Sequence, residues 1–111
     1  MRAGSLYERV AFDAPTYTPD GSGGQDRTWE QQFDCRAHFR WLRSGEAVQA
    51  ARLDGRQPVV TTIRASAASR QITSDWRMRD ARTGTVYNIR SIVPTDDRAY
   101  LELLCEAGVA V

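Results

Sequence analysis

The segment from residue 28 to residue 43 alternates large apolar side chains with charged or polar ones along its whole length. One side of this alternation carries Trp29, Gln31, Phe33, Cys35, Ala37, Phe39 and Trp41. A period of two places alternate side chains on opposite faces of a β-strand, whereas a helix would spread the same rings around its axis. The pattern therefore predicts a long strand with one buried and one solvated face. Because it exceeds the usual strand length, we expect a bend or bulge in it.

Shorter stretches of the same alternation predict further strands over residues 6–12, 59–65, 76–80, 86–93 and 100–106. In the fifth of these six strands, one predicted face carries Tyr87, Ile89, Ser91 and Val93. Strands separated by short turns favour a mainly β fold, a small antiparallel β-barrel or sandwich of about six strands. At 111 residues the chain is too short for two cores, so we expect one domain over residues 1–111.

Two segments depart from the strand pattern. Residues 14–26 are rich in Gly, Pro, Asp and Ser, which indicates a long loop at the tip of the first hairpin. Ser44 is a suitable N-cap for one short helix ending near Arg52. The apolar stripe of this helix is thin, so either tertiary contacts hold it or it docks on another chain, with Glu46 and Val48 as candidate contacts.

Charge and cysteine content exclude several protein classes. The 15 basic and 14 acidic residues leave a net charge of +1, which does not predict a nucleic acid or membrane partner. No apolar run resembles a signal peptide or a membrane span, so we expect a soluble, cytosolic protein. Cys35 and Cys105 fall at inward strand positions and are expected to be reduced core residues, although a disulfide is conceivable if their strands are neighbours.

Residues able to carry catalysis are sparse. His38 is the only histidine and lies on the polar face of the long strand, so it has no partner for a metal site. The adjacent Asp96 and Asp97 lie in a turn and are expected to point apart. No glycine-rich loop joins a strand to a helix in the manner of a phosphate-binding motif. The sequence therefore predicts no catalytic residue, no metal and no cofactor, and we do not expect an enzyme.

Arginine pairs mark the predicted outer faces. Arg36 and Arg40 stand on the long strand, and Arg77 and Arg79 stand on the strand over residues 76–80. If these faces adjoin, they form a basic strip suited to phosphate contact. The alternative is that acidic residues such as Asp34 neutralise them across strands, which we favour for any single pair.

Four motifs, taken in order, resemble the head-tail joining (head-closure, or stopper) family of tailed bacteriophages, prophages and gene transfer agents. They are the opening MRAGSLYERVAF, the DGSGGQ tip followed by Thr28 and Trp29, the strand VYNIRSI and the ending LELLCE. The resemblance covers nearly the whole chain and is weakest over residues 45–57. It rests on the order and spacing of the motifs, because each is made of ordinary strand and turn residues.

This resemblance implies a structural protein of the particle neck. It would form a ring of identical subunits, a hexamer or a dodecamer, around the channel through which double-stranded DNA leaves. Its other partners would be a portal or adaptor protein on one side and a tail terminator or tail tube protein on the other. The protein would assemble in the bacterial cytoplasm and end in the neck of a phage or phage-like particle.

The two segments outside the strands become candidate sites under this hypothesis. Arg52 and Arg56 are expected to face the channel and the DNA. The hairpin tip is expected to contact a neighbouring ring through Asp20, Gly21, Ser22, Gly23, Gly24 and Gln25. These two assignments could be exchanged. The alternative functions are another neck ring protein, either an adaptor or a tail terminator, and a free-standing nucleic-acid-binding β-barrel.

Overall fold

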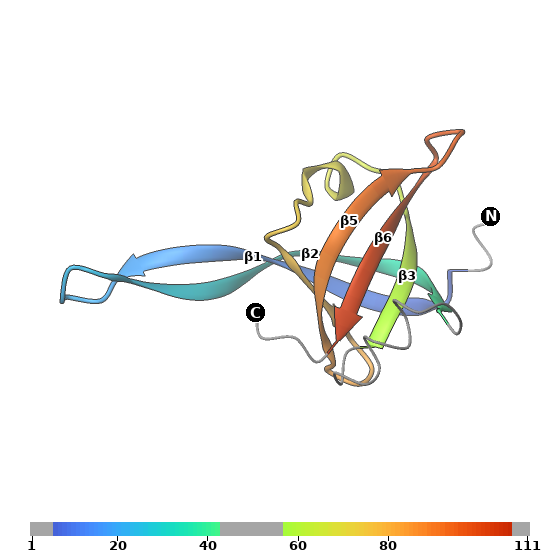
Figure 1. Cartoon of the computed structure of the whole chain (residues 1–111). Helices are drawn as coiled ribbons and strands as arrows, with labels where there is room; N and C mark the ends of the chain where they lie inside the picture. Colours follow the sequence, from blue (N-terminus) through green and yellow to red (C-terminus); the bar gives the residue numbers. More distant parts are fainter. Residues whose placement is uncertain (1–5, 43–56, 108–111) are drawn as a thin grey trace.

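Six antiparallel strands dominate the computed structural model, which describes residues 6–42 and 57–107. The elements are β1 (Glu8–Pro19), β2 (Gln25–Trp41), β3 (Gln57–Arg64), the one-turn 3-10 helix η2 (Ser69–Gln71), β4 (Arg77–Asp80), β5 (Val86–Pro94) and β6 (Tyr100–Ala107). The strands close into a barrel in the order β1-β2-β3-β6-β5-β4 (Figure 1). The predicted fold class is thus confirmed. The expected helix beginning at Ser44 lies outside the described residues.

Most of the barrel core comes from the inward faces that the alternation predicted, although Trp41, expected on the buried face, is 41% exposed. Phe12, Ile63, Met78 and Leu103 are among its largest fully buried side chains. On β2, Ala37 is buried, and Phe33, Cys35 and Phe39 pack against the core from partly buried positions. The Phe12 and Phe33 rings stack with 5.1 Å between their centroids. Burial of these alternate residues is the main force that closes the sheet.

β1 and β2 continue beyond the barrel as a two-stranded ribbon (Figure 1). The expected long loop over residues 14–26 is therefore wrong: the strands pair as far as Pro19 and Gln25, and only residues 20–24 form the turn. Pro15 and Pro19 are compatible with this ribbon because, in the described residues, β1 pairs on its other side with β4 only up to Asp13. A proline on such an edge interrupts no second ladder of hydrogen bonds.

Two irregularities bend the sheet. Phe12 pairs with Phe33 while Asp13 pairs with Gln31, so Gln32 is an extra residue and the expected bulge in the long strand is confirmed. This bulge lies where the ribbon leaves the barrel, and a bulge both bends and twists a strand at that point. The expectation that Trp29 and Gln31 share the buried face of Phe33 is wrong, because the extra residue places both of them on the face of Asp13, beside Arg77 and Arg79.

The second irregularity lies in β5. Ile89 pairs with Cys105 and Ser91 pairs with Leu104, which leaves Arg90 as the extra residue. Beyond it, Ile92 packs against the core and Val93 is 57% exposed. The expectation that Ser91 and Val93 share the face of Ile89 is wrong, because an extra residue reverses every later side chain of the strand.

The part of the chain that the structure describes contains no helix long and apolar enough to cross a membrane.

Candidate functional site

The tip of the ribbon is a compact turn organised by Asp20. Its Oδ1 accepts the N–H groups of Ser22 at 2.8 Å and Gly24 at 3.1 Å, and its own N–H donates to the Gly24 carbonyl at 3.2 Å. Gly21 and Gly23 have φ values of 82° and 86°, in the left-handed region that favours glycine. The structure thus brings together the predicted contact residues 20–25, in a defined conformation and exposed to solvent.

The base of the ribbon is tied to the barrel by Asp13, which is 1% exposed. Its carboxylate accepts hydrogen bonds from Arg77 Nε at 2.7 Å, from Arg79 Nε at 2.7 Å and from Arg79 Nη2 at 3.0 Å. Burial alone would raise the pKa of Asp13, but the hydrogen bonds and charges of Arg79 and Arg77 outweigh it and lower the pKa below its usual value. Asp13 of β1 is therefore a carboxylate that two arginines of β4 hold in place.

Trp29 extends this connection along the ribbon. The guanidinium of Arg77 lies 4.8 Å from the centroid of the Trp29 ring, and that of Arg27 lies 5.0 Å from it. Both distances are within the range of cation–π attraction. Arg79 Nη2 also donates to Gln31 Oε1 at 2.7 Å. Arginines of β4 thus contact both strands of the ribbon, which holds the ribbon at one orientation to the barrel.

The sequence did not reveal Asp13 as the partner of these arginines, because the first strand was expected to end at Phe12. The one available signal was the outward pair Arg77 and Arg79, which called for an acidic partner. The two arginine pairs do not form the basic strip considered above, because Arg77 and Arg79 bind Asp13. On the long strand, Arg36 stands opposite Arg9 of β1. Asp34 pairs with Arg9 at 3.1 Å instead.

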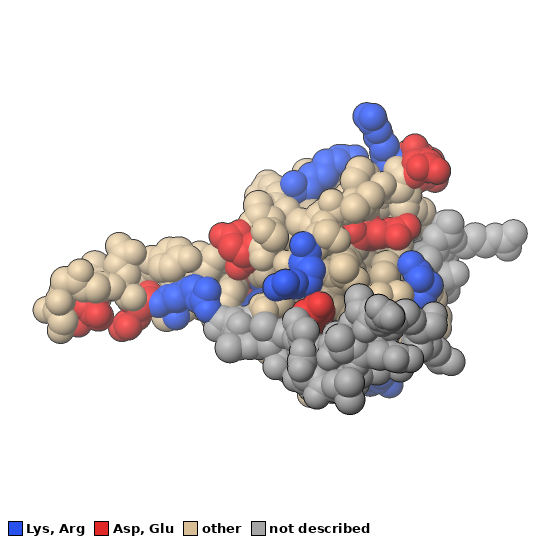
Figure 2. All heavy atoms as spheres, viewed as in Figure 1, with Lys and Arg blue, Asp and Glu red and all other residues tan. Residues whose placement is uncertain are grey.

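Charge is distributed unevenly along the ribbon. Asp20 and Asp26 are exposed near its free end, and Arg27 lies closer to the barrel. Figure 2 shows acidic side chains toward the free end, then basic ones, and a further acidic group where the ribbon meets the barrel. The charge of the ribbon surface therefore varies along its length.

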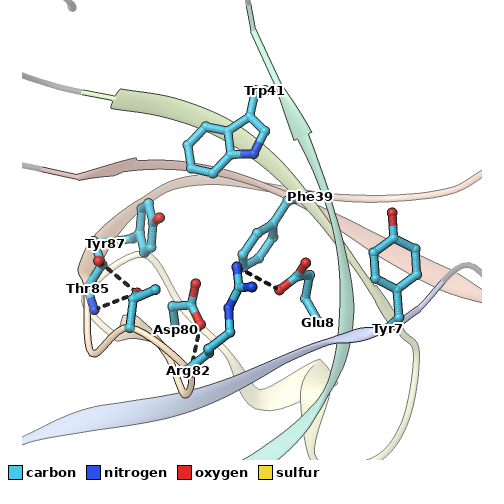
Figure 3. A pocket seen from close by; sticks show the side chains of 9 residues that line it. Tyr7, Glu8, Phe39, Trp41, Asp80, Arg82, Thr85 and Tyr87 are labelled. Atoms are coloured by element: carbon cyan, nitrogen blue, oxygen red, sulfur yellow. Dashed lines mark hydrogen bonds and ion pairs between the residues drawn. The ribbon is translucent and has the colours of Figure 1, made fainter.

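Apart from the ribbon, a concave region of about 420 Å³ lies at one end of the barrel (Figure 3). Phe39, Trp41 and Tyr87 line it together with polar residues of the β4–β5 turn. Its carboxylates are engaged in structure: Glu8 lies 3.9 Å from Arg82, and Asp80 accepts the Arg82 backbone N–H at 2.9 Å. The described lining contains no thiol and no imidazole. Aromatic and charged side chains thus line this pocket together.

The remaining candidate groups for chemistry are two thiols and one imidazole. Cys35 and Cys105 are free thiols, and burial raises their pKa values to about 11 and about 12. A thiol with such a pKa is almost wholly protonated at neutral pH and is a poor nucleophile. His38 is half-buried, in edge contact with Tyr7 at 6.2 Å between ring centroids. Among the described residues, no three His, Cys, Asp or Glu side chains lie close enough to hold a metal ion.

The other predicted site residues, Arg52, Arg56, Glu46 and Val48, lie outside the described residues.

Comparisons with known proteins agree with a β-built structural component. A family model described as phage head completion protein matches residues 1–108. The fold is similar to the solution structure of protein SF1141 from Shigella flexneri 2a, with 26% sequence identity, a TM-score of 0.73 and full coverage of both chains. It is also similar to a chain in the virion of a native gene transfer agent particle, with 20% identity, a TM-score of 0.67 and coverage of 95% of this chain and 97% of that one. No curated protein matches the sequence. The chain belongs to the phage head completion protein family and is a phage head-tail structural protein.

Proposed function

We propose that the chain is a head-closure, or stopper, connector. Copies of it form a ring between the portal or adaptor complex and the tail, and this ring surrounds and closes the DNA exit channel. The observation that carries the proposal is the projecting ribbon, because its tip is exposed and conformationally defined while its base is fixed to the barrel. Membership of the head completion family supports the same function.

A fixed ribbon suits assembly between rings. A contact surface that is ordered before binding loses little conformational entropy on docking. A ring also needs head-to-tail contacts, in which one surface of a subunit meets a different surface of the next. The ribbon tip and the barrel surface differ in shape and charge, so they provide two such surfaces on one chain.

The segment between β2 and β3 is the second functional part of this proposal. Arg52 and Arg56 face the channel, where copies around the ring present a basic collar to the DNA phosphates. Glu46 and Val48 contact a neighbouring chain. Replacing Arg52 and Arg56 by Gln is expected to alter DNA retention and leave ring assembly intact; unchanged retention would remove them from the channel.

The chemistry of the described residues supports a role without catalysis, since burial raises the pKa of both thiols and the carboxylate of Asp13 is bound by two arginines. An adaptor is disfavoured because a mostly helical protein is expected there, and the described residues contain only one short 3-10 helix. A free-standing nucleic-acid-binding barrel would bind DNA as an isolated subunit with a steep dependence on salt.

The test compares two turns that are built alike. Asp20→Ala removes the acceptor of two tip N–H groups, and Asp97→Ala removes the equivalent acceptor of the β5–β6 turn, where Asp97 Oδ1 accepts the Ala99 N–H at 3.0 Å. That turn lies well away from the ribbon (Figure 1). Both variants, and a deletion of residues 21–24, are expected to fold with the wild-type circular dichroism spectrum. Only the tip variants should reduce the joining of filled heads to tails in a complementation assay. Normal joining by the deletion variant would contradict a docking role for the tip.

A further inference from the structure

We propose that the outer edge of β2 along residues 25–29 accepts an extended segment of a different particle protein as an added strand. The inference rests on the proposed function and names how the ribbon would bind its partner. β2 pairs with β3 only from Ala37 to Trp41, so within the described residues its edge from Gln25 to Arg36 has no neighbouring strand. Residues 25–28 of this edge are exposed. An unpaired edge is a template for another strand.

The hydrogen-bonding pattern between β1 and β2 decides which backbone N–H and C=O groups point out from the ribbon. The Asp20 N–H donates to the Gly24 carbonyl, so the backbone groups of these two residues point toward each other. In an antiparallel ladder such pairs alternate with pairs whose N–H and C=O groups point away from each other. The outward-pointing pairs are therefore Pro19 with Gln25, Tyr17 with Arg27, and Pro15 with Trp29.

Proline makes the two edges of the ribbon unequal. On the β1 edge, Pro15 and Pro19 occupy two of the three outward positions and have no N–H to donate. On the β2 edge, Gln25, Arg27 and Trp29 retain all three outward N–H groups and their carbonyls. Proline on an edge strand is a known protection against strand addition, so only the β2 edge is open to it.

The side chains beside this edge define the chemistry of the partner. Arg27 lies on the ribbon face that carries Trp29, and the opposite face carries Asp26, Thr28 and Glu30. Opposite charges on neighbouring strands stabilise a sheet, and like charges destabilise it. The added segment therefore carries an acidic residue next to Arg27 on one face of the sheet. On the other face it carries basic or hydroxyl residues next to Asp26 and Glu30.

A second copy of this chain fits the edge poorly. Pairing two β2 edges would be a twofold contact that closes a dimer, and it could not continue around a ring. Pairing a β2 edge with a β1 edge would meet the two prolines. A different protein with an extended segment meets neither obstacle.

Hydrogen–deuterium exchange with residue-level resolution tests the inference on the full chain, alone and in purified particles. In the isolated subunit the Gln25, Arg27 and Trp29 amides should exchange fast and the Asp26 and Thr28 amides slowly. In particles the first three should slow by about tenfold or more. Equal exchange in both samples would overturn the inference while leaving the proposed function intact. Slow exchange of these three amides in a concentrated solution of the isolated subunit would assign the edge to a second copy of the chain and would also overturn the inference. Absence of the protein from particles would overturn the proposed function itself.

Proline substitution provides a second test. Arg27→Pro removes one outward N–H without touching the ladder to β1, Arg27→Ala controls for the lost side chain, and Tyr17→Pro is the matched change on the closed edge. We expect Arg27→Pro to reduce the yield of joined particles about tenfold relative to Arg27→Ala, since one lost hydrogen bond lowers affinity by about that factor. Tyr17→Pro should join as wild type. Equal yields for Arg27→Pro and Arg27→Ala, with both folded by circular dichroism, would refute the added strand.

Discussion

The buried carboxylate of Asp13 should contribute a large part of the stability of the ribbon. It is 1% exposed and accepts three hydrogen bonds from Arg77 and Arg79, whose side chains are 22% and 31% exposed. In Asp13→Asn the charge is lost and the amide N–H₂ group faces the arginine donors. Breaking a buried ion pair typically costs about 3–5 kcal/mol. Because water reaches both guanidiniums in part, we expect a loss of about 2–3 kcal/mol, which corresponds to a fall in Tm of roughly 10 °C for a chain of this size.

The stability lost in Asp13→Asn should depend on pH and should be smaller at acidic pH. The folded-state pKa of Asp13 is lowered by its arginine partners, whereas in the unfolded chain it is about 3.9. A carboxyl whose pKa is depressed on folding stabilises the protein above its unfolded pKa, and this contribution is lost as the pH falls through the folded pKa. The stability difference between wild type and Asp13→Asn should therefore be constant from neutral pH down to about pH 5 and should shrink below about pH 4.

Urea unfolding followed by circular dichroism measures these differences. Asp34→Asn is the matched control, because Asp34 also pairs with an arginine, Arg9, but both side chains are more than half exposed. The free energy of unfolding of Asp34→Asn should differ from that of the wild type by no more than about 0.5 kcal/mol. If Asp13→Asn cost no more than Asp34→Asn, or if its effect did not change with pH, the carboxylate would not be the tie between ribbon and barrel.

Two further predictions concern the tip and the thiols. Gly23→Ala should lower the free energy of unfolding by about 1 kcal/mol, because φ at this position is 86° while the space around an added Cβ is open; Ser22→Ala is its control, and equal stabilities in urea would contradict the backbone explanation. Cys105, which is fully buried, should react with Ellman's reagent at pH 8 only as fast as the protein unfolds, and the partly buried Cys35 should react far more slowly than a free thiol, since a pKa of about 11 leaves roughly one thiolate in a thousand. A rapid phase in the native protein would show that one of them is accessible and activated.

The sequence alone determined the strand pattern and most of the core. Phe33, Cys35, Ala37 and Phe39 face inward because a period of two is a local property that needs no knowledge of the partner strand. The same reasoning identified the buried face of β3, at Val59 and Ile63. The observed turn at residues 20–24 also falls within the stretch from Asp20 to Gln25 that was expected at the hairpin tip.

Tertiary structure decided where alternation stops and which distant residues meet. The Pro- and Gly-rich composition of residues 14–26 indicates a loop, and only pairing between β1 and β2 converts most of it into a ribbon. The extra residue Arg90 reverses the face of β5, and no local pattern marks it. Asp13 is buried solely because β4 brings Arg77 and Arg79 to it from more than sixty residues away. The physical reason is that local periodicity reflects the geometry of one strand, whereas bulges, edges and buried ion pairs depend on the free energy of contacts between strands.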